Sequence, residues 1–258
     1  MIADDPQALL KALHVTAPRD IDIEAIAQYC GATVMYERLV GCEGRIIGHG
    51  NRAIITVDQR ATTSRKRFSA AHELGHWMKH RGKVALVCNN EQLMCKWEGR
   101  DRESVANRYA AELLLPQYLF QSLLKDKPLT LETVRGLAEQ FETSITATAM
   151  RLVQLTDRPA ALICASAHGR AWFELSPSAK AAQCWPRRTL PVESGAAAIL
   201  KRDEEPIGPR KVSPTVWFGG NNASIRDVVE DTVRITAHLA LSLEGASCRR
   251  RARYGRGR

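Results

Sequence analysis

The motif that most constrains this chain is HELGH at residues 72–76. On an α-helix, residues four apart lie on the same face, so the imidazoles of His72 and His76 point in one direction. Two neutral imidazoles suit zinc, which prefers nitrogen, sulfur or carboxylate ligands in a tetrahedral array. The flanking apolar pattern favours a helix over residues 63–79, so the motif predicts a metal site on a helix. The competing interpretation is an amphipathic helix with two surface histidines.

Glu73 follows the first histidine, where its carboxylate can reach a water molecule next to the metal. It is therefore the expected general base for attack of water on a carbonyl. Gly75 lies between the two ligand turns and leaves room for another element to approach closely.

A catalytic zinc site needs a third protein ligand and an open fourth position. A second helix is expected from about Arg102 to Leu115, where Pro116 ends the pattern. Glu103 lies in its first turn, and Ala106 and Ala110 are small enough for close packing against the first helix. We expect Glu103 to be the third ligand, although an acidic residue there also complements the helix dipole.

Weaker metal-ligand candidates are His80, Cys88, Cys95, Asp101 and Glu112. Candidates for a supporting or substrate-contacting role are Asn107, His80 and Tyr109, and Arg67 is a further candidate for stabilising an oxyanion. A His₂Glu site takes zinc or manganese.

Along the chain, turn residues and hydrophobic periodicity predict alternating short elements. We expect a helix at 22–31, a strand at 32–39, a hairpin at 45–50 and 52–58 with Gly50–Asn51 at its turn, and an irregular stretch at 81–101. A helix-turn-helix pattern follows at 129–155 with Ser144 as an N-cap, then a hairpin at 160–167 and 171–176, a stretch rich in Pro and Gly at 186–221, and a helix near 224–243.

Composition and charge exclude several classes of protein. No apolar run is long enough to span a bilayer, and the N-terminus lacks the pattern of a secretory signal, so we expect a cytoplasmic protein without membrane contact. Seven scattered cysteines without a C-x-x-C pair fit free thiols. Removing the six arginines of the tail at 249–258 lowers the net charge from +9 to +3. We expect that tail to be disordered, either solubilising the protein or touching nucleic acid non-specifically.

The segments DIEAIAQYCGATVMYERL, GRIIGHGNRAIITVD, RKRFSAAHELGHWMKH and ESVANRYAAELLLP, within residues 22–116, resemble the ImmA/IrrE metallo-endopeptidases. The helix-turn-helix stretch extends this resemblance. It implies a compact zincin fold, a small twisted sheet over the active-site helix, with His72, His76 and Glu103 as ligands and Glu73 as base. It also implies a substrate class, a helix-turn-helix repressor whose cleavage derepresses stress-response or mobile-element genes.

Taken together, the sequence predicts an α+β protein in four segments. These are a zincin-like peptidase domain at 1–126, a helix-turn-helix-like segment at 127–157, a small α+β domain at 158–246 that resembles sensor domains and is GAF-like in some members, and the tail at 247–258. An extended substrate often pairs with an edge strand, and residues 52–58 are the candidate edge.

Two other functions compete with the peptidase. One is a DNA-binding regulator that uses the zincin core as a scaffold, favoured by the basic tail and the helix-turn-helix stretch. Against it, Arg151 is the one cation in the second helix of that stretch, and a scaffold has no need of Glu73. The other is a toxin–antitoxin or phage-linked regulator acting by the same proteolysis.

Overall fold

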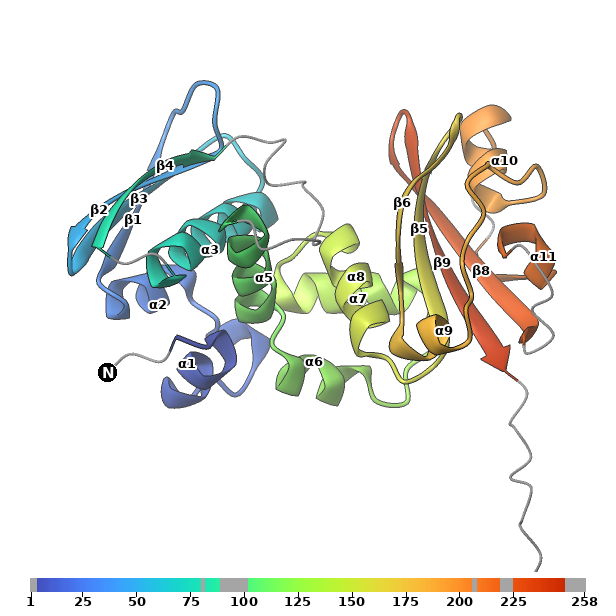
Figure 1. The fold of residues 1–258 in the computed structure, drawn as a ribbon, viewed down its shortest axis with the longest axis horizontal. Helices are drawn as coiled ribbons and strands as arrows, with labels where there is room; N and C mark the ends of the chain where they lie inside the picture. The colour runs from blue at the N-terminus through green and yellow to red at the C-terminus, as the bar shows by residue number, and fades with distance from the viewer. Residues whose placement is uncertain (1–3, 80–81, 89–101, 206–207, 219–224, 249–258) are drawn as a thin grey trace, which may run out of the picture. The chain divides into compact units, whose positions relative to one another are not determined.

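The computed structural model describes residues 4–79, 82–88, 102–205, 208–218 and 225–248, and the chain divides into two compact units. Unit 1 comprises Met1–Lys125 and Gly136–Thr148, and unit 2 comprises Asp126–Arg135 and Ala149–Arg258. Each unit combines a sheet with helices (Figure 1), so the expected α+β class is confirmed. The four segments expected from the sequence stay a prediction.

Unit 1 holds a four-stranded sheet in the order β1-β3-β2-β4. The strands are β1 (Ala32–Glu37), β2 (Gly44–Gly50), β3 (Arg52–Asp58) and β4 (Gly82–Cys88), with β1 parallel to β3 and the other pairs antiparallel. The expected β2–β3 hairpin is confirmed, and Gly50 adopts a φ of +60° at its turn, a conformation that glycine reaches without strain.

Two expectations about this sheet are wrong. The stretch expected to be irregular, 81–101, contains β4 over residues 82–88, because this valine-rich run pairs with the free side of β2. The candidate edge, residues 52–58, lies inside the sheet, because β3 pairs with β2 on one side and with the parallel strand β1 on the other. The described edges of the sheet are therefore β1 and β4.

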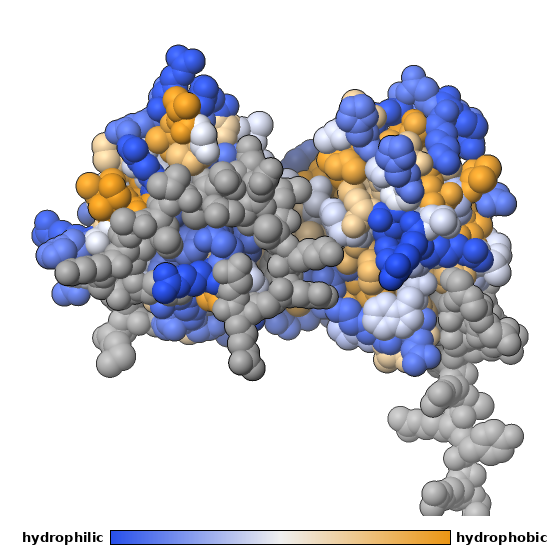
Figure 2. Space-filling model, turned by 45° about the horizontal axis from the view of Figure 1, so that its top comes forward, coloured by the Kyte–Doolittle hydropathy of each residue, from blue (hydrophilic) through white to orange (hydrophobic). Residues whose placement is uncertain are grey.

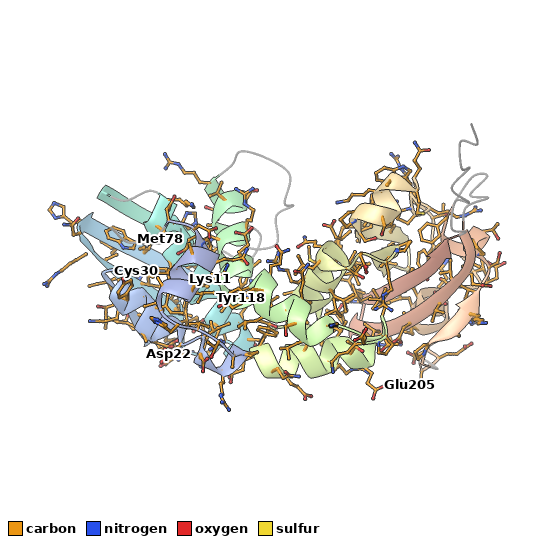
Figure 3. The ribbon with its side chains drawn as sticks, turned by 90° about the horizontal axis from the view of Figure 1, so that it is seen from below. Lys11, Asp22, Cys30, Met78, Tyr118 and Glu205 are labelled. Atoms are coloured by element: carbon orange, nitrogen blue, oxygen red, sulfur yellow. The ribbon has the colours of Figure 1, made fainter. Side chains whose placement is uncertain are left out.

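Five of the described helices of unit 1 lie outside the helix-turn-helix stretch, and aspartates cap the first two of them. They are α1 (Pro6–Ala12), α2 (Ile23–Tyr29), α3 (Thr63–Lys79), α5 (Arg102–Leu114) and α6 (Gln117–Leu124). Asp22 accepts a hydrogen bond from the backbone nitrogen of Ala25 at 2.9 Å and so caps α2. The ammonium of Lys11 on α1 lies 5.5 Å from the ring centre of Tyr118 on α6 (Figure 3), which links the two helices. The expected limits of α3 and α5 are confirmed.

The helix-turn-helix stretch forms α7 (Leu131–Phe141) and α8 (Ile145–Leu155). Ser144 accepts a hydrogen bond from the backbone nitrogen of Ala147 at 3.1 Å, which confirms the expected N-cap. Within unit 1, the ring of Phe141 packs against that of Phe120 at 5.7 Å between centroids.

Unit 2 holds a five-stranded sheet in the order β6-β5-β9-β8-β7. Its strands are β5 (Ala160–Ser166), β6 (Gly169–Leu175), β7 (Arg210–Val212), β8 (Ile225–Thr236) and β9 (Leu239–Cys248). The expected hairpin near 160–176 is confirmed. The prediction of a helix near 224–243 is wrong, because this segment is the β8–β9 hairpin with its turn at 237–238. Val228, Val229 and Val233 favour an extended strand whose side chains alternate between the two faces of the sheet.

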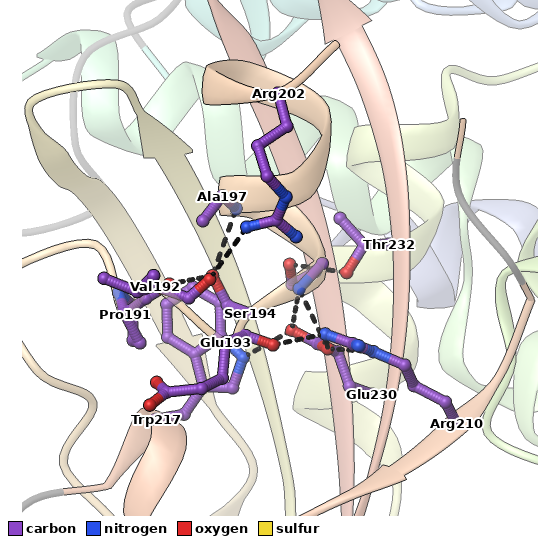
Figure 4. Close-up of polar contacts among 12 residues, drawn as sticks. Pro191, Val192, Glu193, Ser194, Ala197, Arg202, Arg210, Trp217, Glu230 and Thr232 are labelled. Carbon is purple, nitrogen blue, oxygen red and sulfur yellow. Dashed lines mark hydrogen bonds and ion pairs between the residues drawn. The ribbon is translucent and has the colours of Figure 1, made fainter. Parts of the chain in front are cut away.

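Three short helices, α9 (Pro177–Ala181), α10 (Gly195–Lys201) and α11 (Pro214–Trp217), contribute to the apolar core of unit 2. Glu230 of β8 is buried beside this core, where its carboxylate accepts hydrogen bonds from Gly195 N at 2.9 Å, Trp217 Nε1 at 2.8 Å and Arg210 Nε at 2.9 Å (Figure 4). Glu244 of β9, directly opposite, is fully buried, and its carboxyl has no hydrogen-bond partner among the described residues. Burial and then the charge of Glu230 raise the pKa of Glu244 well above its usual value.

Apolar side chains also reach the surface of the part that carries β1–β4, on the left of Figure 2. Ile47 of β2 and Ile54 of β3 are paired in the sheet and are 62% and 50% exposed, so the outer face of this sheet is partly apolar. Within the described residues, no helix is both long and apolar enough to cross a membrane. Cys30, Cys42, Cys164 and Cys184 are free thiols, as expected.

Candidate metal centre

The helix α3, which carries the HELGH motif, is buried along its second half. His72, Glu73 and His76 are completely shielded from solvent, although all three are polar. Trp77 anchors this part of the helix, because its Nε1 donates a hydrogen bond to the carbonyl oxygen of Cys30 at 2.9 Å. Because polar groups are costly to bury, three of them on two turns of one helix require specific partners.

The helix α5 supplies the partners of the two histidines because it packs closely on α3. A Cβ atom added to Gly75 would lie 3.1 Å from the Cα and the carbonyl oxygen of Ala106, and 3.1 Å from Cβ of Tyr109. Gly75 and the small Ala106 therefore allow the two backbones to approach, as the sequence suggested. This approach brings the first turn of α5, and with it Glu103, to the histidines.

The side chains of His72, His76 and Glu103 converge at one point. The Nε2 atoms of His72 and His76 lie 3.0 Å apart, and the two carboxylate oxygens of Glu103 lie 3.2 Å from His72 Nε2 and 3.3 Å from His76 Nε2. A tetrahedral zinc ion with bonds of about 2.0–2.2 Å would hold neighbouring ligand atoms roughly 3.3–3.6 Å apart. The donor set and its spacing therefore fit a divalent metal such as zinc after a shift of a few tenths of an ångström. Among the described residues, this is the group of His, Cys, Asp or Glu side chains able to hold a metal.

Asn107 determines which nitrogen of His72 is free for a metal. Its Oδ1 lies 2.9 Å from His72 Nδ1, so Nδ1 carries the hydrogen and donates it to this acceptor. When Nε2 gives up its own hydrogen, as metal binding requires, its lone pair faces His76 and Glu103. Asn107 thus orients a ligand, the arrangement expected of a residue behind a metal-binding histidine.

Glu103 remains accessible, with 18% of its side chain exposed, whereas both histidines are fully buried. The hydrogen bond with His72, helped by the charges of His76 and His72, holds the pKa of Glu103 below its usual value. The site therefore presents an ionised carboxylate and two imidazoles, a set of ligands that leaves a coordination position for water or substrate.

Glu73 points toward the sheet, at the start of β2. A Cβ atom added to Gly44 would lie only 2.8 Å from Oε1 of Glu73. The loop before β2 also comes close: burial raises the pKa of the Cys42 thiol, and the charge of Glu73 adds to this rise. Sequence reasoning missed this contact, because Gly44 has the local pattern of a simple turn residue.

The other expected candidates divide into three groups. His80, Cys95, Asp101 and the arginine-rich tail lie outside the described residues, as does the side chain of Cys88. Glu112 is described but does not belong to the metal-ligand group. Cβ of Tyr109 lies beside Gly75, and the Tyr109 ring lies 5.9 Å from the ammonium of Lys79. Arg67 donates to the carbonyl of Ile21 at 3.0 Å and pairs with Glu142 at 3.2 Å, so Arg67 supports the fold.

Comparison with known proteins gives two similarities. The family model described as the IrrE N-terminal-like domain (Peptidase_M78) matches residues 27–153, which include both helices of the site. Eleven chains of solved structures match. One of them, described as a Mycobacterium tuberculosis transcriptional regulator, has a TM-score of 0.58 and 14% identity, over 93% of this chain and 86% of that chain, and thus shares the fold. No curated protein sequence matches the chain.

Proposed function

Because residues 27–153 form an IrrE N-terminal-like domain of the Peptidase M78 family, a metallopeptidase family, we propose that this protein is a zinc-dependent endopeptidase that cleaves a helix-turn-helix repressor. The convergence of His72, His76 and Glu103 within 4.8 Å of one another is the observation that carries the proposal. The sheet packed over α3 is consistent with a zincin-like layout.

In this proposal the residues divide the work. His72, His76 and Glu103 hold the metal, which when bound polarises the scissile carbonyl and lowers the pKa of a water molecule. Glu73 accepts the proton of the attacking water and later passes it to the amine of the leaving segment. Asn107 keeps His72 in the orientation and tautomer that binding needs.

We further propose that the substrate pairs with the edge strand β4. This strand lies next to β2, and Cys88 of β4 is in register with Gly44, the residue that abuts Glu73. A peptide extended along the outer edge of β4 would therefore run beside the base. The other edge, β1, is separated from β2 by β3, so it lies farther from that position.

The proposed substrate class is based on the family resemblance. In this proposal, cleavage of the repressor derepresses stress-response or mobile-element genes. The competing function is a DNA-binding regulator, which is favoured by the α7–α8 pair and by the structural similarity to a protein described as a transcriptional regulator. Arg151, the one cation of α8, is 8% exposed. Because α8 presents no exposed cation for phosphate or base contacts, we prefer the peptidase.

The decisive comparison is between wild type and Glu73→Gln, with Glu103→Ala as the metal-binding control. We expect one zinc per chain by elemental analysis in wild type and in Glu73→Gln, and weaker binding in Glu103→Ala. Added to a lysate of the source cells, wild type but not Glu73→Gln should create new N-termini within a helix-turn-helix protein, read by mass spectrometry. Identical N-termini with both proteins, or no metal in wild type, would favour the regulator.

A further inference from the structure

We propose that Gly44 is a positioning residue for the general base: the missing side chain at the start of β2 leaves the space in which the Glu73 carboxylate is held. The inference rests on the proposed role of Glu73. It assigns a task to a residue outside the HELGH motif and outside α5.

The contact between Gly44 and Glu73 is closer than any side chain would allow. A Cβ atom at Gly44 would lie 2.8 Å from Oε1, 3.2 Å from Cγ and 3.4 Å from Cδ of Glu73. All three near atoms belong to this one side chain. The Gly44 backbone thus forms one wall of the space that the carboxylate occupies.

The β2 backbone cannot easily retreat from this contact, because the residue before Gly44 is tied on two sides. The carbonyl oxygen of Glu43 accepts a hydrogen bond from Asp58 N at 2.9 Å, and the Glu43 carboxylate forms an ion pair with Arg65 of α3. Gly44 itself is in register with Val57 of β3 and Cys88 of β4. A clash at this position must therefore be relieved by movement of the Glu73 side chain.

The backbone at Gly44 does not itself require glycine. Gly31, Gly41, Gly50, Gly169 and Gly208 are the described glycines with positive φ, and Gly44 is not among them. Alanine can adopt the conformation of Gly44 in a strand, so the requirement for glycine comes from the neighbouring carboxylate and not from the backbone conformation.

Gly48 of the same strand provides a matched comparison. A Cβ atom there would lie 2.6 Å from Cζ3 and 3.0 Å from Cε3 of Trp77. Both glycines thus make room for a side chain of α3, but one faces an indole in the core and the other faces the carboxylate of the base. An alanine at position 48 therefore disturbs β2–α3 packing without touching Glu73.

The expected effect of Gly44→Ala is a displacement of the carboxylate. Restoring an ordinary contact of 3.4 Å from 2.8 Å requires Oε1 to move by at least 0.6 Å. Misplacement of a reacting group by about 1 Å can lower a rate on the order of 100-fold. Metal binding should persist, because none of the three ligand side chains is among the nearest atoms to Gly44.

The test replaces the metal with Co²⁺ and follows its visible absorption spectrum against pH, which needs no substrate. Wild type, Glu73→Gln, Gly44→Ala, Gly48→Ala and the double variant Gly44→Ala with Glu73→Gln are compared. Removing the carboxylate in Glu73→Gln should shift the midpoint of the spectral transition. Gly44→Ala should shift it in the same direction by at least half as much, Gly48→Ala should keep the wild-type midpoint, and the double variant should match Glu73→Gln.

The other outcomes identify which idea fails. If Gly44→Ala superimposes on wild type while Glu73→Gln differs, the role of Gly44 is refuted and the peptidase proposal stands. If Gly48→Ala shifts as much as Gly44→Ala, or if Gly44→Ala loses Co²⁺ together with thermal stability, Gly44 is a packing residue and the inference is overturned. If wild type binds no Co²⁺, or if Glu73→Gln leaves the midpoint unchanged, the proposed function falls, and this inference falls with it.

Discussion

Replacing Asn107 by leucine tests the geometry behind the metal site. The side chain is buried, and its oxygen accepts the hydrogen of His72 Nδ1 at 2.9 Å. Leucine has a similar volume but no acceptor, so the Nδ1 hydrogen would remain in a buried site without a partner. We expect the protein to lose about 1–3 kcal/mol of stabilising free energy at this site, the usual cost of leaving one buried polar group unsatisfied.

Part of this loss should be seen as weaker metal binding, because His72 can then rotate or exchange tautomers. Losing the hydrogen-bond partner of a metal-bound histidine typically weakens metal binding by about 10–100-fold. This range corresponds to about 1.4–2.7 kcal/mol, within the cost of one unsatisfied donor.

The assay is zinc affinity by competition with a chromogenic chelator, together with thermal unfolding of the metal-free protein. Asn107→Asp is the matched control, because it keeps an acceptor oxygen at the same distance along the side chain. We expect Asn107→Asp to retain much tighter binding than Asn107→Leu. Zinc affinity of Asn107→Leu close to that of wild type would refute the idea that this hydrogen bond orients His72.

Three further substitutions have clear expected outcomes. Gly75→Ala places Cβ 3.1 Å from the backbone of Ala106, so it should force α3 and α5 apart and lower the free energy of unfolding by roughly 1–3 kcal/mol. Zinc binding should also weaken, as measured by the same competition assay. Glu244→Gln should raise the melting temperature more at pH 8 than at pH 5. Because the pKa of Glu244 is raised in the folded protein, the fold favours the neutral carboxyl. The wild-type protein therefore has its full stability below the unfolded pKa of about 4.3 and loses stability as pH rises through the folded pKa, whereas the glutamine in Glu244→Gln does not titrate. Equal shifts of the melting temperature at both pH values would contradict this. Asp231→Ala should lower the free energy of unfolding in urea by roughly 1 kcal/mol, because the Asp231 carboxylate accepts a hydrogen bond from Leu131 N at 2.7 Å at the start of α7. An unchanged urea midpoint would show that this cap is dispensable.

The parts of the fold that could be predicted have strong local signals. The limits of α3 follow from periodicity, the cap at Ser144 from its side-chain chemistry, and the β2–β3 hairpin from the Gly50–Asn51 turn. The convergence of His72, His76 and Glu103 could be predicted because an i, i+4 histidine pair sets a direction and small residues on α5 permit an approach from that side. These are short-range rules of geometry.

The predictions from the sequence were wrong or incomplete where contact with a distant segment determines the local structure. The segment 224–243 has apolar residues at spacings that fit a helix as well as a strand, and pairing of β8 with both β7 and β9 selects the strand. The position of β3 inside the sheet depends on β1, which pairs with it although β2 lies between them in the sequence. Gly44 acquires its importance from a side chain twenty-nine positions away, so no local pattern could mark it.

The path of the chain through its two units limits how the protein can be shortened. Phe141, which packs on Phe120 in unit 1, belongs to a segment that follows ten residues of unit 2. A fragment that ends at residue 125 would contain every expected metal ligand and the base, yet it would expose the face of Phe120 that Phe141 covers. The smallest fragment that contains the whole of unit 1 would have to extend through residue 148 and carry the Asp126–Arg135 stretch with it. Recombination that exchanged the second unit for another would have to cut within α8, which makes the two units hard to shuffle as separate modules.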